Sequence, residues 1–75
     1  MNRLRDLRED NDLTQKECAK IAYISKNSYI RYEKDERIPT VDTLTIFAKF
    51  YNTSIDYIVG LTDEIKPYPR RKRKE

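Results

Sequence analysis

A chain of 75 residues, 37 % hydrophobic and 39 % charged, has room for one small domain around a minimal core. It has no histidine and one cysteine, Cys18, so the usual metal ligands, catalytic bases and disulfide pairs are lacking. We therefore expect no enzyme, no metal or cofactor, and no small-molecule substrate. The sequence shows neither a long apolar run nor a signal-peptide pattern, which predicts a cytoplasmic protein without membrane contact.

The net charge of +3 is unevenly distributed along the chain. Residues 1–65 contain ten Lys or Arg and twelve Asp or Glu, whereas residues 66–75 contain six basic residues and one acidic residue. Because the body is slightly acidic, net charge alone does not predict that it binds a polyanion. Whether the body binds a polyanion depends on the direction in which its basic side chains point.

The first part of the chain predicts two short helices. Apolar residues at helical spacing indicate a helix over residues 2–11. Thr14, followed three residues later by Glu17, has the pattern of a capping box and predicts a second helix that ends at about Ala22.

A third helix follows after a very short connection. Ser25 is a candidate cap for a helix over residues 26–34, about three residues after the second helix. Two helices joined so closely must cross at a steep angle, which is the geometry of a helix-turn-helix.

Two further helices and a tail complete the chain. Thr40 is a candidate cap for a helix over residues 41–51, and Ser54 for a short helix over residues 55–59. Residues 62–75 have no apolar period and contain a continuous basic run. The sequence thus predicts one domain over residues 1–61 and a disordered basic tail over residues 62–75.

The third predicted helix has two different faces. At about 100° per residue, Tyr29 and Tyr32 point away from a polar arc about 140° wide. That arc contains Lys26, Asn27, Arg31 and Lys34. These residue types suit the major groove of B-DNA, where Arg and Lys donate to guanine and Asn pairs with adenine. A solvated helix face is the alternative, and the short preceding turn shifts the balance toward DNA.

Gln15 lies in the first turn of the second helix. In helix-turn-helix proteins the first helix of the motif crosses the DNA backbone. Gln15 could therefore bond a phosphate or brace Lys26, and an ordinary polar residue is the alternative.

Several segments together resemble one family. They are Leu13-Thr14-Gln15-Lys16-Glu17-Cys18-Ala19, Ile24-Ser25, Tyr29, Arg31-Tyr32-Glu33, Arg37-Ile38-Pro39, and the apolar pattern from Leu44 to Ile58. Over residues 3–60 the chain resembles the lambda-repressor-like (Xre-type) helix-turn-helix family. The resemblance implies an all-α, five-helix DNA-binding domain that places its third helix in the major groove.

The resemblance also implies roles for particular residues. The implied DNA contacts are Gln15, Lys26, Asn27, Ser28, Arg31, Tyr32, Lys34 and Arg37. Base contacts are implied for Lys26, Asn27 and Arg31, and backbone or base contacts for Gln15 and Ser28. Phosphate contacts are implied for Tyr32, Lys34 and Arg37. A structural ion pair is implied between Arg8 and Glu33.

The chain departs from the family at two turns. Tyr23 and Asp35 occupy positions where the family often has glycine. If the backbone at Tyr23 is left-handed, its side chain costs about 1–2 kcal/mol.

Three large apolar residues are not assigned by the family pattern. Ile46, Phe50 and Tyr57 lie in the last two predicted helices, through which the family commonly dimerises. They are candidates for a homodimer interface, and completion of the core is the alternative. A two-fold dimer would read an inverted repeat in double-stranded DNA.

These observations predict a sequence-specific DNA-binding protein, a transcriptional regulator and more specifically a repressor. An antitoxin or adaptor that uses the same fold to bind a protein is the main alternative. A nonspecific nucleic-acid binder driven by its basic tail is a third hypothesis.

Overall fold

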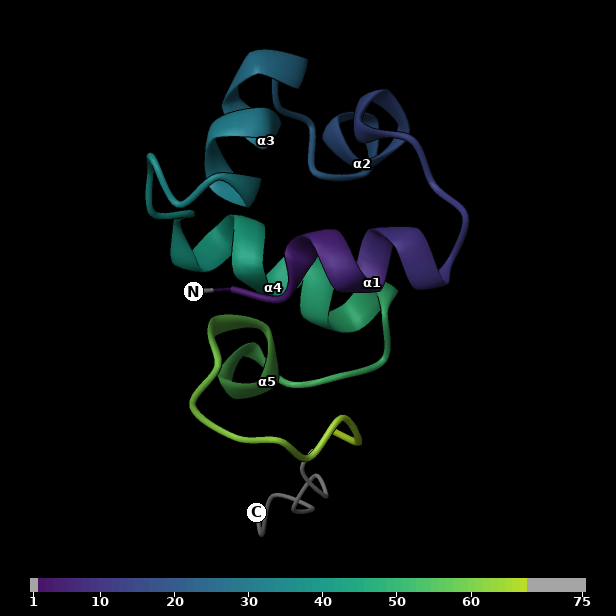
Figure 1. Ribbon diagram of the computed structural model, residues 1–75, viewed down its shortest axis with the longest axis vertical. Helices are drawn as coiled ribbons and strands as arrows, with labels where there is room; N and C mark the ends of the chain where they lie inside the picture. The colour runs from purple at the N-terminus through teal and green to yellow at the C-terminus, as the bar shows by residue number, and fades with distance from the viewer. Residues whose placement is uncertain (1, 68–75) are drawn as a thin grey trace, which may run out of the picture.

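Five α-helices lie within residues 2–67, the part of the chain that the computed structural model describes (Figure 1). They are α1 (Leu4–Asp10), α2 (Gln15–Ile21), α3 (Lys26–Glu33), α4 (Val41–Phe50) and α5 (Ile55–Val59). Each predicted helix is present, and its ends agree with the prediction within two residues. No strand occurs in the described residues, and no helix there is long and apolar enough to cross a bilayer.

Side-chain caps explain where four of the helices begin. Thr14, Ser25, Thr40 and Ser54 each accept a hydrogen bond from the backbone N–H three residues later. The Glu17 carboxylate also accepts from the Thr14 N–H at 2.9 Å, which completes the predicted capping box. These local bonds satisfy N–H groups that would otherwise have no partner at a helix start.

Left-handed backbone follows every one of these helices. Asp12, Tyr23, Asp35 and Asn52 have φ of 54°, 57°, 59° and 54°. Gly60, the only glycine in the sequence, has φ 87° after α5. The chain therefore keeps the turns predicted at Tyr23 and Asp35 without the glycine that would relieve their strain.

The core is built around two aromatic rings. Tyr29 of α3 and Phe47 of α4 are fully buried, and their ring centroids lie 5.8 Å apart in an edge-to-face arrangement. The other buried apolar residues are Leu4, Leu7, Cys18, Ala19, Ala22, Tyr32, Leu44, Ala48 and Ile58. In Figure 1, α1 and α4 lie in the middle, α2 and α3 form one end, and α5 lies at the other.

The segment after α5 remains attached to the domain. The Arg3 guanidinium donates to the Thr62 carbonyl at 2.7 Å and pairs with Asp63 at 2.7 Å. The Thr53 hydroxyl donates to the carbonyl of Ile65. Contacts with the domain thus continue past the boundary predicted at residue 61. The disorder predicted for the tail stays a prediction, because residues 68–75 lie outside the described part of the chain.

Candidate nucleic-acid interface

The α2–α3 pair has the geometry of a helix-turn-helix. Residues 22–25 connect the two helices, and α3 crosses α2 steeply in Figure 1. Tyr29 is fully buried and Tyr32 is 7 % exposed, so one side of α3 is held against the core. The opposite side of α3 is consequently fixed in direction.

That opposite side is the polar face predicted from the sequence. Lys26, Asn27, Arg31 and Lys34 are all exposed. Ser28 is half-buried, and its hydroxyl accepts a hydrogen bond from the Ser25 hydroxyl at 3.0 Å. Arg37 is exposed in the connection between α3 and α4. Tyr32 belongs to the core, so little of its surface is available for the phosphate contact expected of it.

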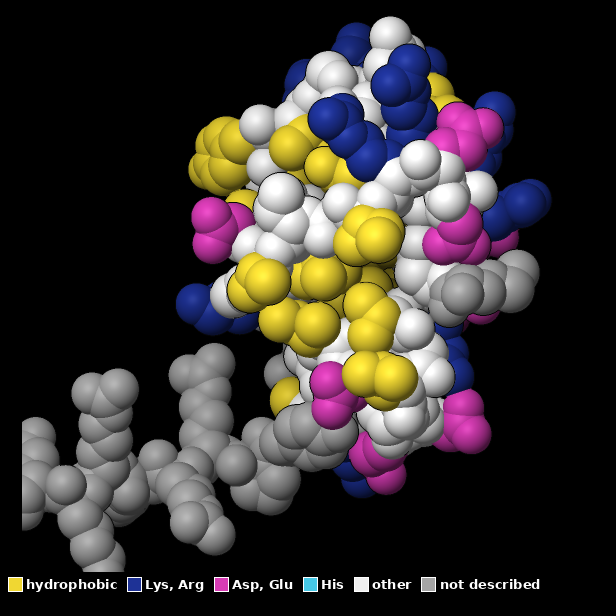
Figure 2. All heavy atoms as spheres, turned by 90° about the vertical axis from the view of Figure 1, so that its left-hand side faces the viewer, with side chains coloured by type: hydrophobic (Ala, Val, Ile, Leu, Met, Phe, Trp, Pro, Cys, Tyr) yellow, Lys and Arg dark blue, Asp and Glu magenta, His cyan; other side chains and the backbone are white. Residues whose placement is uncertain are grey.

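Basic side chains are concentrated at this end of the molecule. Residues 15–34, which include α2 and α3, contain five Lys or Arg and two Asp or Glu. Figure 2 shows Lys and Arg side chains gathered at the end that α2 and α3 form. Residues 1–65 are slightly acidic as a whole, but their charges are separated, with the positive charges concentrated at the end that contains α3.

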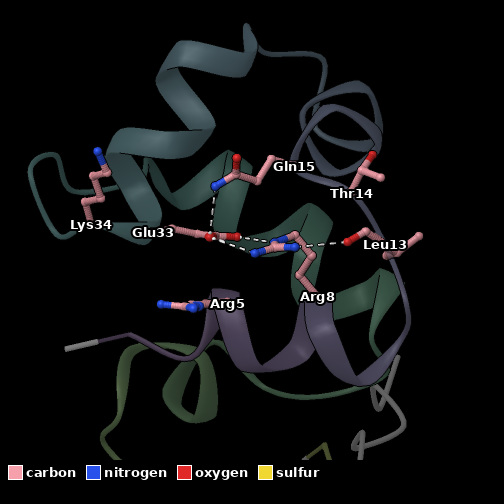
Figure 3. Close-up of a pocket in the computed structure, with 7 residues that line it drawn as sticks. All are labelled: Arg5, Arg8, Leu13, Thr14, Gln15, Glu33 and Lys34. Carbon is pink, nitrogen blue, oxygen red and sulfur yellow. Dashed lines mark hydrogen bonds and ion pairs between the residues drawn. The ribbon is translucent and has the colours of Figure 1, made fainter.

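An ion pair behind this face joins α1 to α3 (Figure 3). Arg8 Nε lies 2.6 Å from Glu33 Oε2, and the two side chains are 16 % and 5 % exposed. Arg8 also donates to the Leu13 carbonyl at 3.1 Å. Gln15 donates to Glu33 at 3.4 Å, which brings the start of α2 into the same network. The three helices that form the candidate interface are thus tied together at one carboxylate.

This network keeps Glu33 ionised. Burial by itself would raise the pKa of Glu33, but the hydrogen bond and the charge of Arg8, together with smaller contributions from other neighbours such as Gln15, hold the pKa below its usual value. The same hydrogen bond to Glu33 raises the pKa of Arg8. The ion pair expected between Arg8 and Glu33 is therefore present.

Gln15 has a hydrogen-bond partner that the sequence did not predict. The Gln15 amide donates to Glu33, so Gln15 does not brace Lys26, which was one of its two expected roles. It lines a pocket of about 470 Å³ together with Arg5, Arg8, Leu13, Thr14, Glu33 and Lys34. Arg5 was missed by sequence reasoning. The sequence does contain a hint, because Arg5 precedes Arg8 by three residues and such a spacing puts two side chains on neighbouring positions of one helix face.

The proposed dimer residues are only partly exposed. Ile46 and Tyr57 pack against the core, and the Arg3 guanidinium lies 4.3 Å from the centroid of the Tyr57 ring. Phe50 is 49 % exposed and touches Tyr51 edge-on at 5.1 Å. These contacts favour the core-completing alternative for Ile46 and Tyr57.

Comparison with known proteins defines the family. The family model described as Helix-turn-helix matches residues 4–58, so the chain belongs to this family, as its resemblance to the lambda-repressor-like type implied. It is 44 % identical over 70 residues to the uncharacterized HTH-type transcriptional regulator YobD of Bacillus subtilis, covering 93 % of this chain and 62 % of YobD.

Two further relatives are named as regulators. The chain is 41 % identical over 63 residues to the HTH-type transcriptional regulator ImmR of Bacillus subtilis, covering 84 % of this chain and 49 % of ImmR. It is 40 % identical over 59 residues to the cryptic phage CTXphi transcriptional repressor RstR of Vibrio cholerae, covering 79 % of this chain and 53 % of RstR. The chain thus spans between about half and two thirds of these relatives. No solved structure matches it.

Proposed function

We propose that this chain is a sequence-specific DNA-binding transcriptional regulator that acts in the cytoplasm and inserts α3 into the major groove. The observation that carries the proposal is the exposed polar face of α3, which lies opposite the buried rings of Tyr29 and Tyr32. Membership of the helix-turn-helix family supports it. The relatives named as transcriptional regulators support the regulatory role, and RstR, named as a repressor, supports repression.

Base recognition is assigned to the first two turns of α3. Lys26 and Asn27 stand at the N-terminal end of the helix, the part that reaches furthest into the groove in this docking geometry. Arg31 lies farther along the same exposed face. Lys and Arg donate to guanine O6 and N7, and Asn can form two hydrogen bonds with adenine.

Backbone contacts surround this set. Gln15, Ser28, Lys34 and Arg37 are assigned to the DNA backbone, with Gln15 and Ser28 also near the bases. Arg5 joins them, because it lines the pocket with Gln15 and Lys34. Such contacts fix the register of the protein on the duplex and make the affinity dependent on salt.

The ion pair of Arg8 with Glu33 supports this role without contacting DNA in our proposal. It neutralises a carboxylate that would otherwise repel phosphates at the pocket. It also holds α1 against α3, so that the groups on both helices meet the duplex in one fixed geometry.

We further propose that the regulator binds an inverted repeat as a homodimer. A two-fold dimer presents two copies of α3 to half-sites about one DNA turn, roughly 34 Å, apart. Each half-site then contributes separately to specificity, which offsets the small contact area that a single short helix offers.

Selection of binding sites from random duplex DNA tests the proposal. The full chain should enrich one sequence, and Arg31→Ala should lose the preference at one base pair per half-site, at a cost of about 1–3 kcal/mol. Lys49→Ala, which removes an exposed charge from α4, is the matched control and should change nothing. A uniform loss for Arg31→Ala would make it a phosphate contact. If the full chain enriches no sequence, the nonspecific or protein-binding alternative holds.

A further inference from the structure

One apolar side chain lies within the polar face of the recognition helix. Ile30 is half-buried, with Lys26 one turn before it and Lys34 one turn after it along α3. Asn27 precedes Ile30 by three positions, and Arg31 follows it directly. The side chains assigned to bases and phosphates thus surround a side chain that can form no hydrogen bond.

Ile30 does not belong to the core. Within residues 2–67 it is the one half-buried apolar residue that does not pack against the buried core. At about 100° per residue, Ile30 points about 100° away from Tyr29 and about 160° away from Tyr32, the two residues that hold α3 inward. The packing of the domain therefore gives no reason for an isoleucine at this position.

The direction and stiffness of Ile30 suit a contact in the major groove. Helical side chains lean toward the N-terminus, so Ile30 leans toward Lys26 and Asn27, at the end of α3 that reaches furthest into the groove. Isoleucine is branched at Cβ and keeps largely one rotamer in a helix. It therefore offers a fixed apolar surface and loses less conformational freedom on binding than a long side chain would.

The charges around Ile30 favour DNA as its partner over an apolar surface of another protein. Lys26, Arg31 and Lys34 are exposed, and none of them takes part in an ion pair within residues 2–67. Figure 2 shows Lys and Arg side chains gathered at this end of the molecule. A duplex places phosphates along both sides of its groove, so it neutralises these cations while a base edge meets the isoleucine.

The major groove offers an isoleucine one fitting partner. Thymine presents its C5-methyl group there, whereas the other bases present chiefly hydrogen-bond donors and acceptors. An isoleucine packed against a donor or acceptor would displace its water and leave that group without a partner, at a cost in free energy. Ile30 can therefore favour thymine and disfavour the other bases at the same position.

We propose that Ile30 is a specificity-determining residue that packs against the C5-methyl group of one thymine in each half-site. This inference rests on the proposed function and deepens it, because it names a base and the group on it that is recognised. Hydrogen bonds from Lys26, Asn27 and Arg31 set the register, and Ile30 excludes the wrong base at one position among their contacts.

Replacement of thymine by deoxyuracil in the selected duplex tests the contact, because it removes only the methyl group and keeps the base pair. Each thymine position is replaced in turn, in both half-sites together. At one position the affinity of the full chain should fall by about fourfold per half-site, as expected when one apolar carbon loses its contact. Ile30→Ala should bind the thymine duplex more weakly and distinguish it from the deoxyuracil duplex by less than about twofold.

Val41→Ala is the matched control for the loss of an apolar side chain. Val41 is 71 % exposed at the start of α4, and its removal should leave the ratio of the two affinities as in wild type. Far-ultraviolet circular dichroism checks that both variants are folded. A wild type that is insensitive to deoxyuracil at every position would overturn the inference, and so would an Ile30→Ala variant that keeps the wild-type ratio.

The same experiment separates this inference from the proposed function. If wild type selects a sequence but the affinity ratio does not depend on Ile30, the proposed function stands and only the role of Ile30 fails. If wild type selects no sequence, the proposed function fails and the role of Ile30 fails with it.

Discussion

At the scale of single residues, the Glu33 carboxylate matters most for the shape of the interface. It accepts from Arg8 of α1 and from Gln15 of α2 while it is itself part of α3. A charge that is only 5 % exposed is stable only while these donors remain. The stability of the fold and the geometry of the proposed DNA-binding face are therefore coupled at this residue.

Removing Arg8 should reveal this coupling. Arg8→Ala leaves a buried carboxylate without its charged partner, and we expect the free energy of unfolding to fall by about 3 kcal/mol. Arg5→Ala is the matched control. It breaks a 3.5 Å pair with Glu9 in which the side chains are 69 % and 53 % exposed, and it should cost less than about 0.5 kcal/mol. Urea unfolding measures both. Equal losses would show that the buried pair has no special role.

Acid should weaken the same contact. The pKa of Glu33 is lower in the folded chain than the ordinary value of 4.5, so protonation favours unfolding. The stabilisation by Glu33 is complete above about pH 4.5 and is lost as the pH falls through the folded-state pKa. Glu33→Gln should be less stable than wild type at pH 7, and the difference should shrink toward pH 3 in urea titrations. A constant difference would contradict the assignment.

At the scale of elements, the helix ends are the strained parts of this chain. Tyr23 has φ 57° in the turn between α2 and α3 and is 90 % exposed, so its side chain gains little from packing. Asp12, Asp35 and Asn52 adopt similar backbone, but Asp and Asn tolerate it better than a tyrosine does. The turn that sets the direction of α3 is therefore held by its flanking helices against a local cost.

Replacing Tyr23 should relieve that cost. Tyr23→Gly should raise the free energy of unfolding by about 1 kcal/mol, since glycine adopts left-handed backbone without a steric penalty. The control Tyr23→Ala removes the ring but keeps the Cβ atom, and it should gain much less. Thermal unfolding followed by circular dichroism measures the difference. If both variants lost stability equally, contacts of the tyrosine ring would matter more than the backbone.

At the scale of the whole molecule, charge is arranged along the long axis. The basic end contains α2 and α3, while the segment of residues 62–65, which Arg3 and Thr53 hold, lies at the α5 end (Figure 1). Residues 70–74 contain only Lys and Arg and lie outside the described residues. The attached residues 62–65 lie at the end of the domain opposite α3.

Deleting residues 66–75 tests whether the tail contributes to binding. The deletion removes six basic residues, and we expect weaker DNA binding with a smaller dependence of affinity on salt concentration. Preference among sequences should remain, because base contacts are assigned to α3. Titrations of a selected duplex at several salt concentrations measure the slope. An unchanged slope would show that the tail does not touch DNA.

The sequence by itself determined the helices and the face of α3. Caps such as Thr14 and Ser54 act on a backbone group three residues away, and the direction of Arg31 relative to Tyr29 follows from the helical repeat. Such relations are local, so they can be predicted before the fold is known. The pairing of Arg8 with Glu33 came from family resemblance, because 25 residues separate the partners.

Only the tertiary structure decided which apolar and polar side chains meet. The sequence did not distinguish Ile46 and Tyr57 from Phe50, yet Ile46 and Tyr57 pack on the core. Other large apolar residues, namely Ile38, Val41 and Leu61, stay exposed. The bond from Gln15 to Glu33 likewise depends on how α2 and α3 cross. Burial and long-range contacts are set by the relative placement of whole helices, which no periodicity within one helix encodes.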